Sequence, residues 1–173
     1  LELCINGNFN QGNTGFTTPL NLTQQYIFVP DSPNVQTELT IPGRYGVDTN
    51  ANNYSADYFG HDHTSGSGKF YFARGFPLIQ PIAWQEVIPV TPNTNYYFSA
   101  WAQGLDSAGN NPIMRFSVNG TTVGTDLTLT NHARYALAPD NWQRFYALWN
   151  SGSATTAAFS ITDVRTFSTG NGF

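Results

Sequence analysis

The stretch that decides the fold runs from Trp84 to Asn119. It reads Trp84-Gln-Glu-Val-Ile-Pro-Val-Thr-Pro-Asn-Thr-Asn-Tyr-Tyr-Phe-Ser-Ala-Trp-Ala102, then a loop, then Pro112-Ile-Met-Arg-Phe-Ser-Val-Asn119. Apolar side chains recur at every second position in three segments, which is the pattern of half-buried β-strands. The buried positions expected from this alternation are Trp84, Ile88, Val90, Tyr96, Phe98, Ala100, Ala102, Met114, Phe116 and Val118. Turn residues separate the segments, so the stretch predicts the middle of an antiparallel β-sandwich.

Short apolar segments on both sides of this stretch extend the pattern. The further strands that we expect are Leu1–Ile5, Gln24–Val29, a short one near Leu39–Ile41, Lys69–Ala73, Thr121–Leu129, Trp142–Trp149 and Ala157–Arg165. Asn119-Gly120 is a hairpin signal. The count of short strands predicts an all-β fold, a jelly-roll β-sandwich of two antiparallel sheets, with residues 1–173 as one domain.

Composition narrows the function classes. The formal net charge is −4 with only 7 Lys and Arg residues, which argues against nucleic-acid binding because that requires a basic surface. No apolar run approaches the roughly 18 residues that a membrane span needs. The sequence shows neither an initiator Met nor a signal peptide, so we expect a mature or excised piece of a larger secreted or cell-surface protein. The single cysteine, Cys4, lies in an apolar segment and is expected to be a buried thiol.

No constellation of residues marks an enzyme. The sequence lacks the nucleophile elbow, the zinc-protease motif and the phosphate-binding loop, and its carboxylates form no marked pair. The run His61-Asp62-His63 invites a metal or acid–base interpretation, but it lies in a Gly/Ser loop. No partner cysteine and no obvious third ligand accompany it, so we favour a structural role. The prediction is a protein that is not an enzyme.

Alternation also assigns side chains to the opposite face of the strands. If Phe98 and Phe116 face inward, then Tyr97, Trp101 and Arg115 face outward. Tyr146, with Arg144, is expected to join them from the strand near Trp142–Trp149. Aromatic rings stack on sugars, so Tyr97, Trp101, Arg115 and Tyr146 are the candidate glycan-binding residues. The alternative is that residues 31–68, rich in tyrosine, cover this face and that the rings only pack internally.

Several motifs resemble a known superfamily. They are Asn6-Gly-Asn-Phe-Asn-Gln-Gly12 with Gly15-Phe16, Asp62-His-Thr-Ser-Gly-Ser-Gly-Lys-Phe-Tyr71, Val90-Thr-Pro-Asn-Thr-Asn-Tyr-Tyr-Phe-Ser-Ala-Trp101 and Trp142-Gln-Arg-Phe145 with Trp149-Asn-Ser-Gly152. In this order they are similar to the galactose-binding-like jelly-roll carbohydrate-binding modules of the family 4/9/22 type, and the second motif is also similar to one in MAM domains. The resemblance implies a jelly roll and says little about the ligand. It also implies that Asp62 and His63 belong to a structural turn, in which Thr64 bonds locally.

The resemblance also implies a structural calcium ion in the opening loop, where Asn8 and Asn10 would be ligands. Relatives usually have a glutamate where this chain has Asn10, and a further carboxylate comes from a last strand that follows a loop like Ser168–Phe173. Calcium takes six to eight oxygens, usually including carboxylates. Both expected carboxylates are missing from the sequence, so calcium is only a possible cofactor.

Two functions remain open. The first is a non-catalytic, extracellular carbohydrate-binding module whose partner is a glycan or polysaccharide. The alternative is a structural subunit or adhesive domain of a surface layer or filament, in which a strand from another copy or a neighbouring domain is added to the sandwich. The motive for the alternative is that Ala157–Arg165 is the last expected strand, and we expect an added strand to lie against it or against Leu1–Ile5.

Overall fold

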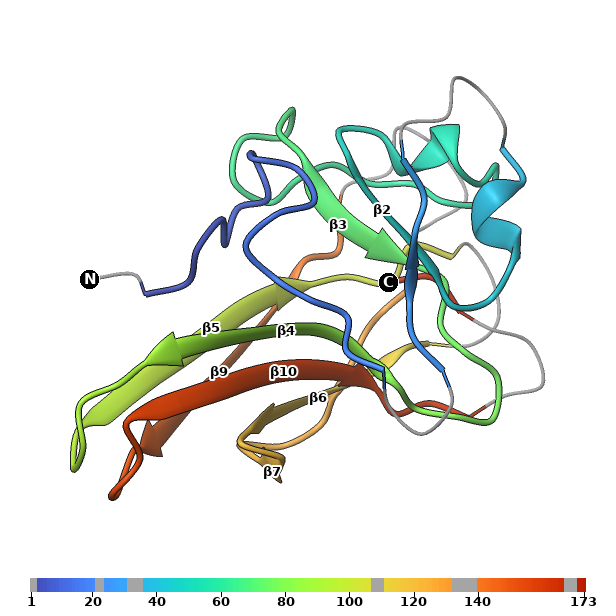
Figure 1. Cartoon of the computed structure of the whole chain (residues 1–173). Helices are drawn as coiled ribbons and strands as arrows, with labels where there is room; N and C mark the ends of the chain where they lie inside the picture. The colour runs from blue at the N-terminus through green and yellow to red at the C-terminus, as the bar shows by residue number, and fades with distance from the viewer. Residues whose placement is uncertain (1–2, 21–23, 31–35, 107–110, 132–139, 167–170) are drawn as a thin grey trace.

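The computed structural model is an all-β protein (Figure 1). It describes residues 3–20, 24–30, 36–106, 111–131, 140–166 and 171–173. The strands are β1 (Ile27–Phe28), β2 (Arg44–Asp48), β3 (Phe70–Ala73), β4 (Ile82–Pro89), β5 (Asn95–Ala102), β6 (Ile113–Val118), β7 (Thr121–Thr122), β8 (Leu127–Thr128), β9 (Gln143–Asn150) and β10 (Thr156–Asp163). Two short 3-10 helices, η1 (Glu38–Thr40) and η2 (Ala51–Asn53), are the helical elements of the described ranges.

The strands form three sheets rather than the two that we expected. One sheet has the order β4-β10-β6-β7, with β8 also paired to β6, and a second consists of β5 and β9. The third has the order β1-β2-β3, in which β1 pairs with β2 in parallel and β2 with β3 in antiparallel. The other strand pairs are antiparallel, as is usual when hairpins connect the strands. Antiparallel pairing is therefore confirmed, and the division into sheets differs.

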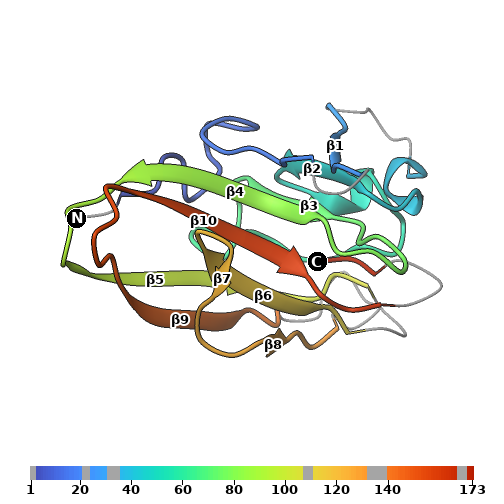
Figure 2. The ribbon, with the colours of Figure 1, turned by 60° about the horizontal axis from the view of Figure 1, so that its bottom comes forward.

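The main core lies between β4-β10-β6 and the β5-β9 pair (Figure 2). The ring of Phe98 on β5 stacks on Phe159 of β10 with centroids 4.9 Å apart. Phe116 of β6 stacks on Phe145 of β9 with centroids 3.5 Å apart. These contacts join the two layers, and each comes from a position that alternation assigns to the interior. The buried faces predicted for Trp84, Ile88, Val90, Phe98, Met114, Phe116 and Val118 are confirmed.

The tyrosine-rich segment 31–68 builds a core of its own with the third sheet, as far as the structure describes it. Tyr54 and Tyr58 are almost fully buried and belong to a cluster with Phe70 and Phe72 of β3. Tyr45 of β2 stacks on Tyr71 of β3 with centroids 5.1 Å apart. Long irregular segments in compact proteins are often packed by their own side chains. These tyrosines are therefore used for internal packing.

Phe9, Phe16 and Phe173 pack against both the main core and the cluster around Tyr45. They link the three sheets by contacts between side chains.

Four expected elements differ in the structure. Leu3–Ile5 forms bends and turns instead of a strand, and Leu39 lies in η1, where its N–H donates to the Tyr54 carbonyl. Residues 121–129 are interrupted at Gly124, which has φ +68°, so only β7 and β8 form. β10 ends at Asp163.

β2 was not predicted, because Gly46 breaks its alternation. A Cβ at Gly46 would lie 2.5 Å from the Phe72 ring, so the glycine is what lets β2 approach that ring. The Asn119-Gly120 hairpin is confirmed, with φ values of +51° and +77° at the two turn residues.

Candidate functional site

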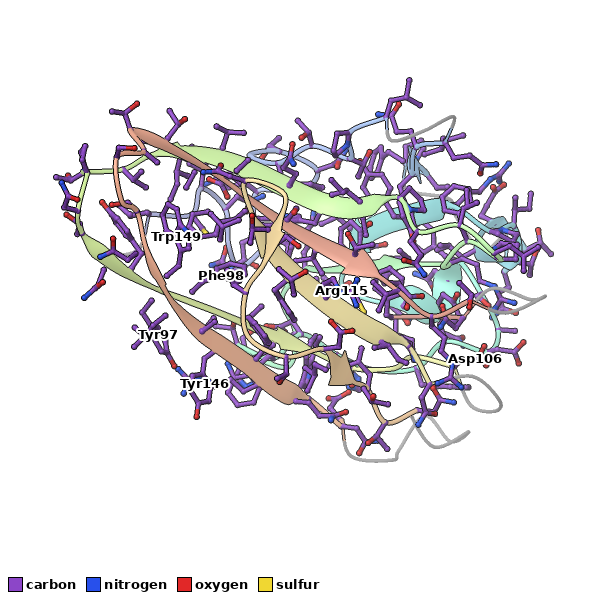
Figure 3. The ribbon with its side chains drawn as sticks, turned by 90° about the horizontal axis from the view of Figure 1, so that it is seen from below. Tyr97, Phe98, Asp106, Arg115, Tyr146 and Trp149 are labelled. Carbon is purple, nitrogen blue, oxygen red and sulfur yellow. The ribbon has the colours of Figure 1, made fainter. Side chains whose placement is uncertain are left out.

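The outer face of the β5-β9 pair carries the candidate site. Antiparallel register places Tyr97 opposite Leu148, Ser99 opposite Tyr146 and Trp101 opposite Arg144. The exposed fractions are 53% for Tyr97, 44% for Trp101 and 63% for Tyr146. Figure 3 shows Tyr97 and Tyr146 outside the ribbon of β9, whereas Phe98 lies between the layers. Three large aromatic side chains thus share one face and remain open to solvent.

One guanidinium group connects these three rings. The Arg144 Cζ lies 5.8 Å from the ring centroid of Tyr97, 5.9 Å from that of Trp101 and 5.8 Å from that of Tyr146. Its Nη2 also donates to the Tyr97 hydroxyl at 3.1 Å. The rings of Tyr97 and Tyr146 are nearly parallel, with an interplanar angle of 25° and centroids 5.9 Å apart. Cation–π attraction at such distances orders the side chains, so the face is a defined surface. We call Tyr97, Trp101, Arg144 and Tyr146 the aromatic platform.

A loop closes one end of the aromatic platform. The imidazole of His63 stacks on Trp101 with centroids 3.9 Å apart and an interplanar angle of 17°. Trp142 meets the same imidazole edge-on at 5.9 Å and donates its Nε1–H to the His61 carbonyl at 3.1 Å. Through His63, the tyrosine-rich segment 31–68 contacts Trp101 of the platform. Tyr97 and Tyr146 remain uncovered. The contact between His63 and Trp101 was not predicted, because the two lie 38 positions apart in the sequence.

Asp62 holds this loop in place. Its carboxylate accepts main-chain N–H groups of Thr64 at 2.9 Å, Ser65 at 2.7 Å and Gly68 at 2.5 Å. Burial opposes ionisation, but the hydrogen bonds from Ser65, Gly68 and Thr64 outweigh it and hold the pKa of Asp62 below its usual value. His61 pairs instead with Asp140, with 3.3 Å between Nδ1 and Oδ2. The structural interpretation of the loop is therefore confirmed for Asp62.

Arg115 does not belong to the platform. It precedes Phe116 on β6, and Phe116 points inward against Phe145, so Arg115 lies on the outer side of the other sheet. There it makes a bidentate ion pair with Asp126, with Nε–Oδ1 at 2.9 Å and Nη2–Oδ2 at 2.7 Å. Of the four predicted ligand residues, the structure brings together Tyr97, Trp101 and Tyr146. We expected both Arg115 and Arg144 on this face, and the structure places only Arg144 there.

The opening loop offers a poor set of calcium ligands among the described residues. The Asn8 side-chain oxygen accepts the Asn10 N–H at 3.2 Å, and the Asn10 oxygen accepts the Lys69 N–H at 3.4 Å. A Cβ atom at Gly12 would lie 3.9 Å from the Lys69 Nζ, so the positive charge of Lys69 borders the opening loop. No group of three or more His, Cys, Asp or Glu side chains in the described ranges is placed to hold a metal ion. Asn8 and Asn10 do not fit calcium in this arrangement.

A pocket of about 350 Å³ lies next to the aromatic platform and shares Trp101 with it, and His63 and Trp142 also line this pocket. Its interior is mostly apolar, lined by Trp84, Phe98, Leu105, Met114 and Ile161. Cys4, which we expected to be buried, is half-buried at the edge of this pocket. The pocket therefore faces the main core, whereas the aromatic platform faces solvent.

The chain matches no protein-family model, and no curated protein matches it significantly. The fold and the platform define an all-β protein with antiparallel sheets and an exposed aromatic surface. The resemblance to carbohydrate-binding modules accordingly rests on the sequence motifs alone.

Among the described residues, no helix is long and apolar enough to cross a membrane.

Proposed function

We propose that this protein is a non-catalytic carbohydrate-binding module of jelly-roll type, secreted or displayed at the cell surface, and that the aromatic platform binds the glycan. The observation that carries the proposal is the set of three exposed rings, Tyr97, Trp101 and Tyr146, around the Arg144 guanidinium. An exposed cluster of large aromatic side chains on one face is typical of an interaction surface. The similarity of the motifs to those of carbohydrate-binding modules supports this class of protein, and the aromatic platform itself supports sugar as the ligand class.

The chemistry of the platform suits a sugar chain. The apolar C–H face of a pyranose stacks on an aromatic ring, and the nearly parallel rings of Tyr97 and Tyr146 offer two such surfaces side by side. Arg144 supplies N–H donors for hydroxyl groups. Asn95 and Asn150, whose side chains bond each other at 2.7 Å, add amide groups at the far end of the same face. Because the platform is open, it favours an extended polysaccharide over an enclosed monosaccharide.

A glycan array tests this function directly. The wild type and a Tyr97→Ala, Trp101→Ala double variant are compared, and the expected result is binding of at least one polysaccharide class that the double variant loses. Val87→Ala is a matched control, because Val87 is 61% exposed but lies on β4 in the other sheet. A folded wild type that binds no glycan would contradict the proposal. Equal loss in the Val87 variant would show that the platform is not the site.

A further inference from the structure

The aromatic platform holds a positive charge that no carboxylate of the described residues neutralises. Arg144 forms no ion pair with an Asp or Glu side chain in the described part of the chain. Its Nη2 donates a hydrogen bond of 3.1 Å to the Tyr97 hydroxyl, and its other contacts are the three rings. Because the Arg144 side chain is exposed, its charge is open to a ligand.

The other arginines among the described residues are engaged with carboxylates. The ion pairs are Arg44–Glu38, Arg74–Asp106 and Arg115–Asp126, and Arg165 attracts the Asp163 carboxylate. The chain has 11 acidic and 7 basic side chains, so carboxylates are not scarce. Arg144 therefore differs from the other arginines in its position, which is a face without carboxylates.

The outward positions of β5 and β9 are all described, and none of them holds an acidic residue. Alternation places on this face Asn95, Tyr97, Ser99 and Trp101 of β5 and Arg144, Tyr146, Leu148 and Asn150 of β9. The formal charge of the face is thus +1, from Arg144, although the net charge of the protein is −4. An anion that approaches Arg144 meets a cation and no repelling side chain on this face.

Two acidic side chains are found in and beside the loop that closes one end of the platform, and both have partners. The Asp62 carboxylate accepts main-chain N–H groups of its own loop. Asp140 accepts the His61 N–H at 3.0 Å and faces the imidazole of the same residue at 3.3 Å. These contacts hold both carboxylates away from Arg144, so its guanidinium stays available.

The Arg144 guanidinium keeps enough donors for a planar anion. A guanidinium has five N–H donors, and the Tyr97 hydroxyl uses one of them. The hydroxyl accepts this bond, so its own proton can be donated to the same anion. A carboxylate matches the guanidinium by two parallel N–H···O bonds. The surrounding rings exclude part of the water around the cation, and lower local polarity strengthens an ion pair.

We propose that the aromatic platform is specific for a polysaccharide that contains uronic acid residues. This inference rests on the carbohydrate-binding function proposed above and narrows its ligand. The carboxylate of one uronic acid residue pairs with Arg144, and the C–H faces of the sugar chain stack on Tyr97, Tyr146 and Trp101. Because the face has one cation, it holds one carboxylate at a time. This fits a chain in which neutral sugar residues separate the acidic ones.

Single-stranded nucleic acid is a rival ligand, because it also combines stacking rings with negative charge. It carries a phosphate at every nucleotide, and proteins that bind it follow its backbone with a positively charged groove. The outer face of β5 and β9 offers a single guanidinium, and the net charge of −4 repels a dense polyanion. The charge of the face therefore favours a sparsely charged glycan.

The strand edge that the sequence suggested as another interaction site is not present. β10 pairs with β4 on one side and with β6 on the other, so it is a central strand and offers no edge. The expectation that a strand would be added against Ala157–Arg165 is wrong, because the last strand in the sequence is not the last strand in the sheet. Leu3–Ile5, near the other expected place, forms bends and turns.

Titration calorimetry with matched polysaccharides tests the preference for uronic acid. The probes are glucuronoxylan and hyaluronan, in which neutral sugar residues separate the acidic ones. Each is compared with its carboxyl-reduced form, which has neutral sugars on an unchanged backbone. We expect the wild type to bind at least one acidic form about three- to fivefold more tightly than the reduced form, which is the size of an exposed ion pair. Salt at about 1 M should remove this preference by screening.

Two variants locate the charge that causes the preference. Arg144→Gln keeps an amide donor and removes the charge, so it should bind the acidic and reduced forms equally while still binding the reduced form. Arg115→Gln is the matched control, because Arg115 pairs with Asp126 on the outer side of the other sheet, apart from Tyr97 and Tyr146 (Figure 3). It should keep the wild-type preference. Thermal melting shows that both variants are folded.

The outcomes separate this inference from the function on which it rests. Equal affinity of the wild type for acidic and reduced forms would overturn the uronic acid proposal and leave the carbohydrate-binding function standing. Absence of binding to every glycan would overturn both. Tighter binding of dextran sulfate or of oligo-dT than of the uronic acid polymers would show a general attraction to anions or a nucleic-acid ligand, and either result overturns the proposal. So would a preference that persists in Arg144→Gln.

Discussion

The two faces of the β5-β9 pair contain the same kinds of residue and have opposite roles. On the inner face, Phe98 and Phe145 are 7% and 5% exposed and pack against the other sheet. On the outer face, their chain neighbours Tyr97 and Tyr146 are 53% and 63% exposed and surround Arg144. Aromatic content alone therefore does not separate core from interaction surface. The separation comes from alternation along each strand and from what covers each face.

The largest difference between the faces is expected in stability. Phe145→Ala removes a ring stacked on Phe116 and leaves a cavity, so the free energy of unfolding should fall by about 3–5 kcal/mol. Tyr146→Ala, one residue further on, should change it by less than about 1 kcal/mol because the side chain is mostly exposed. Urea unfolding of both variants measures the contrast. Similar losses in the two variants would mean that the outer face is covered.

The second difference concerns binding, and it assumes the proposed glycan function. Trp101→Ala removes one ring of the platform and should weaken polysaccharide affinity at least about tenfold, or about 1.4 kcal/mol, with little loss of stability. Isothermal titration calorimetry with a polysaccharide found on the array gives the affinity. Phe98→Leu provides the opposite case, in which stability changes and affinity does not. Unchanged affinity in the Trp101 variant would exclude this ring from the site.

A smaller effect is expected from Arg144. Arg144→Met removes the charge that lies over the three rings, and the cation–π contribution at an exposed site is about 0.5–1 kcal/mol. Arg144→Lys keeps the charge but loses the planar guanidinium that donates to the Tyr97 hydroxyl, so we expect an intermediate value. Urea unfolding gives the stability of both variants, and calorimetry gives their glycan affinity. If both behave as wild type, Arg144 does not organise the platform.

The smallest effect is the pH dependence from Asp62, whose loop places His63 on Trp101. The pKa of Asp62 is lowered in the folded state, so its contribution to stability is present above the ordinary aspartate pKa of about 4 and is lost as pH falls through the folded value. Melting temperatures of the wild type should therefore fall below about pH 4 more steeply than those of Asp62→Asn. Parallel acid limbs in the two proteins would show that the carboxylate charge does not matter.

Asp163 is expected to contribute a pH dependence of stability that is opposite in sign to that of Asp62, and the Asp163→Asn variant tests this. Burial raises the pKa of Asp163 in the folded state, although main-chain N–H groups of Arg165 and Ile113 partly offset this. A raised folded pKa gives a contribution that is present below the unfolded value and is lost as pH rises through the folded value. Replacing the carboxylate by an amide should therefore make the free energy of unfolding depend less on pH above about pH 4 than it does in the wild type. A steeper dependence in the variant would contradict the sign.

The sequence by itself determined which side chains of the long strands face the core. Within the three segments between Trp84 and Asn119 the inward positions are mostly apolar, so burial of Ile88, Phe98 and Phe116 follows from a local period of two. Tyr97, Trp101 and Tyr146 were assigned to the other face by the same rule. The Asn119-Gly120 turn was also readable, because few residues accept its positive φ angles.

Only the tertiary structure decided which of these strand faces lie on the same side of the molecule. Arg115 and Tyr97 both face outward, but β6 and β5 belong to different sheets, so the two side chains lie on opposite sides of the core. The stacking of His63 on Trp101 and the central place of β10 likewise depend on pairings between residues far apart in the chain. Alternation is a property of single strands and contains no information on which strands become neighbours. That choice is made by packing across the whole molecule.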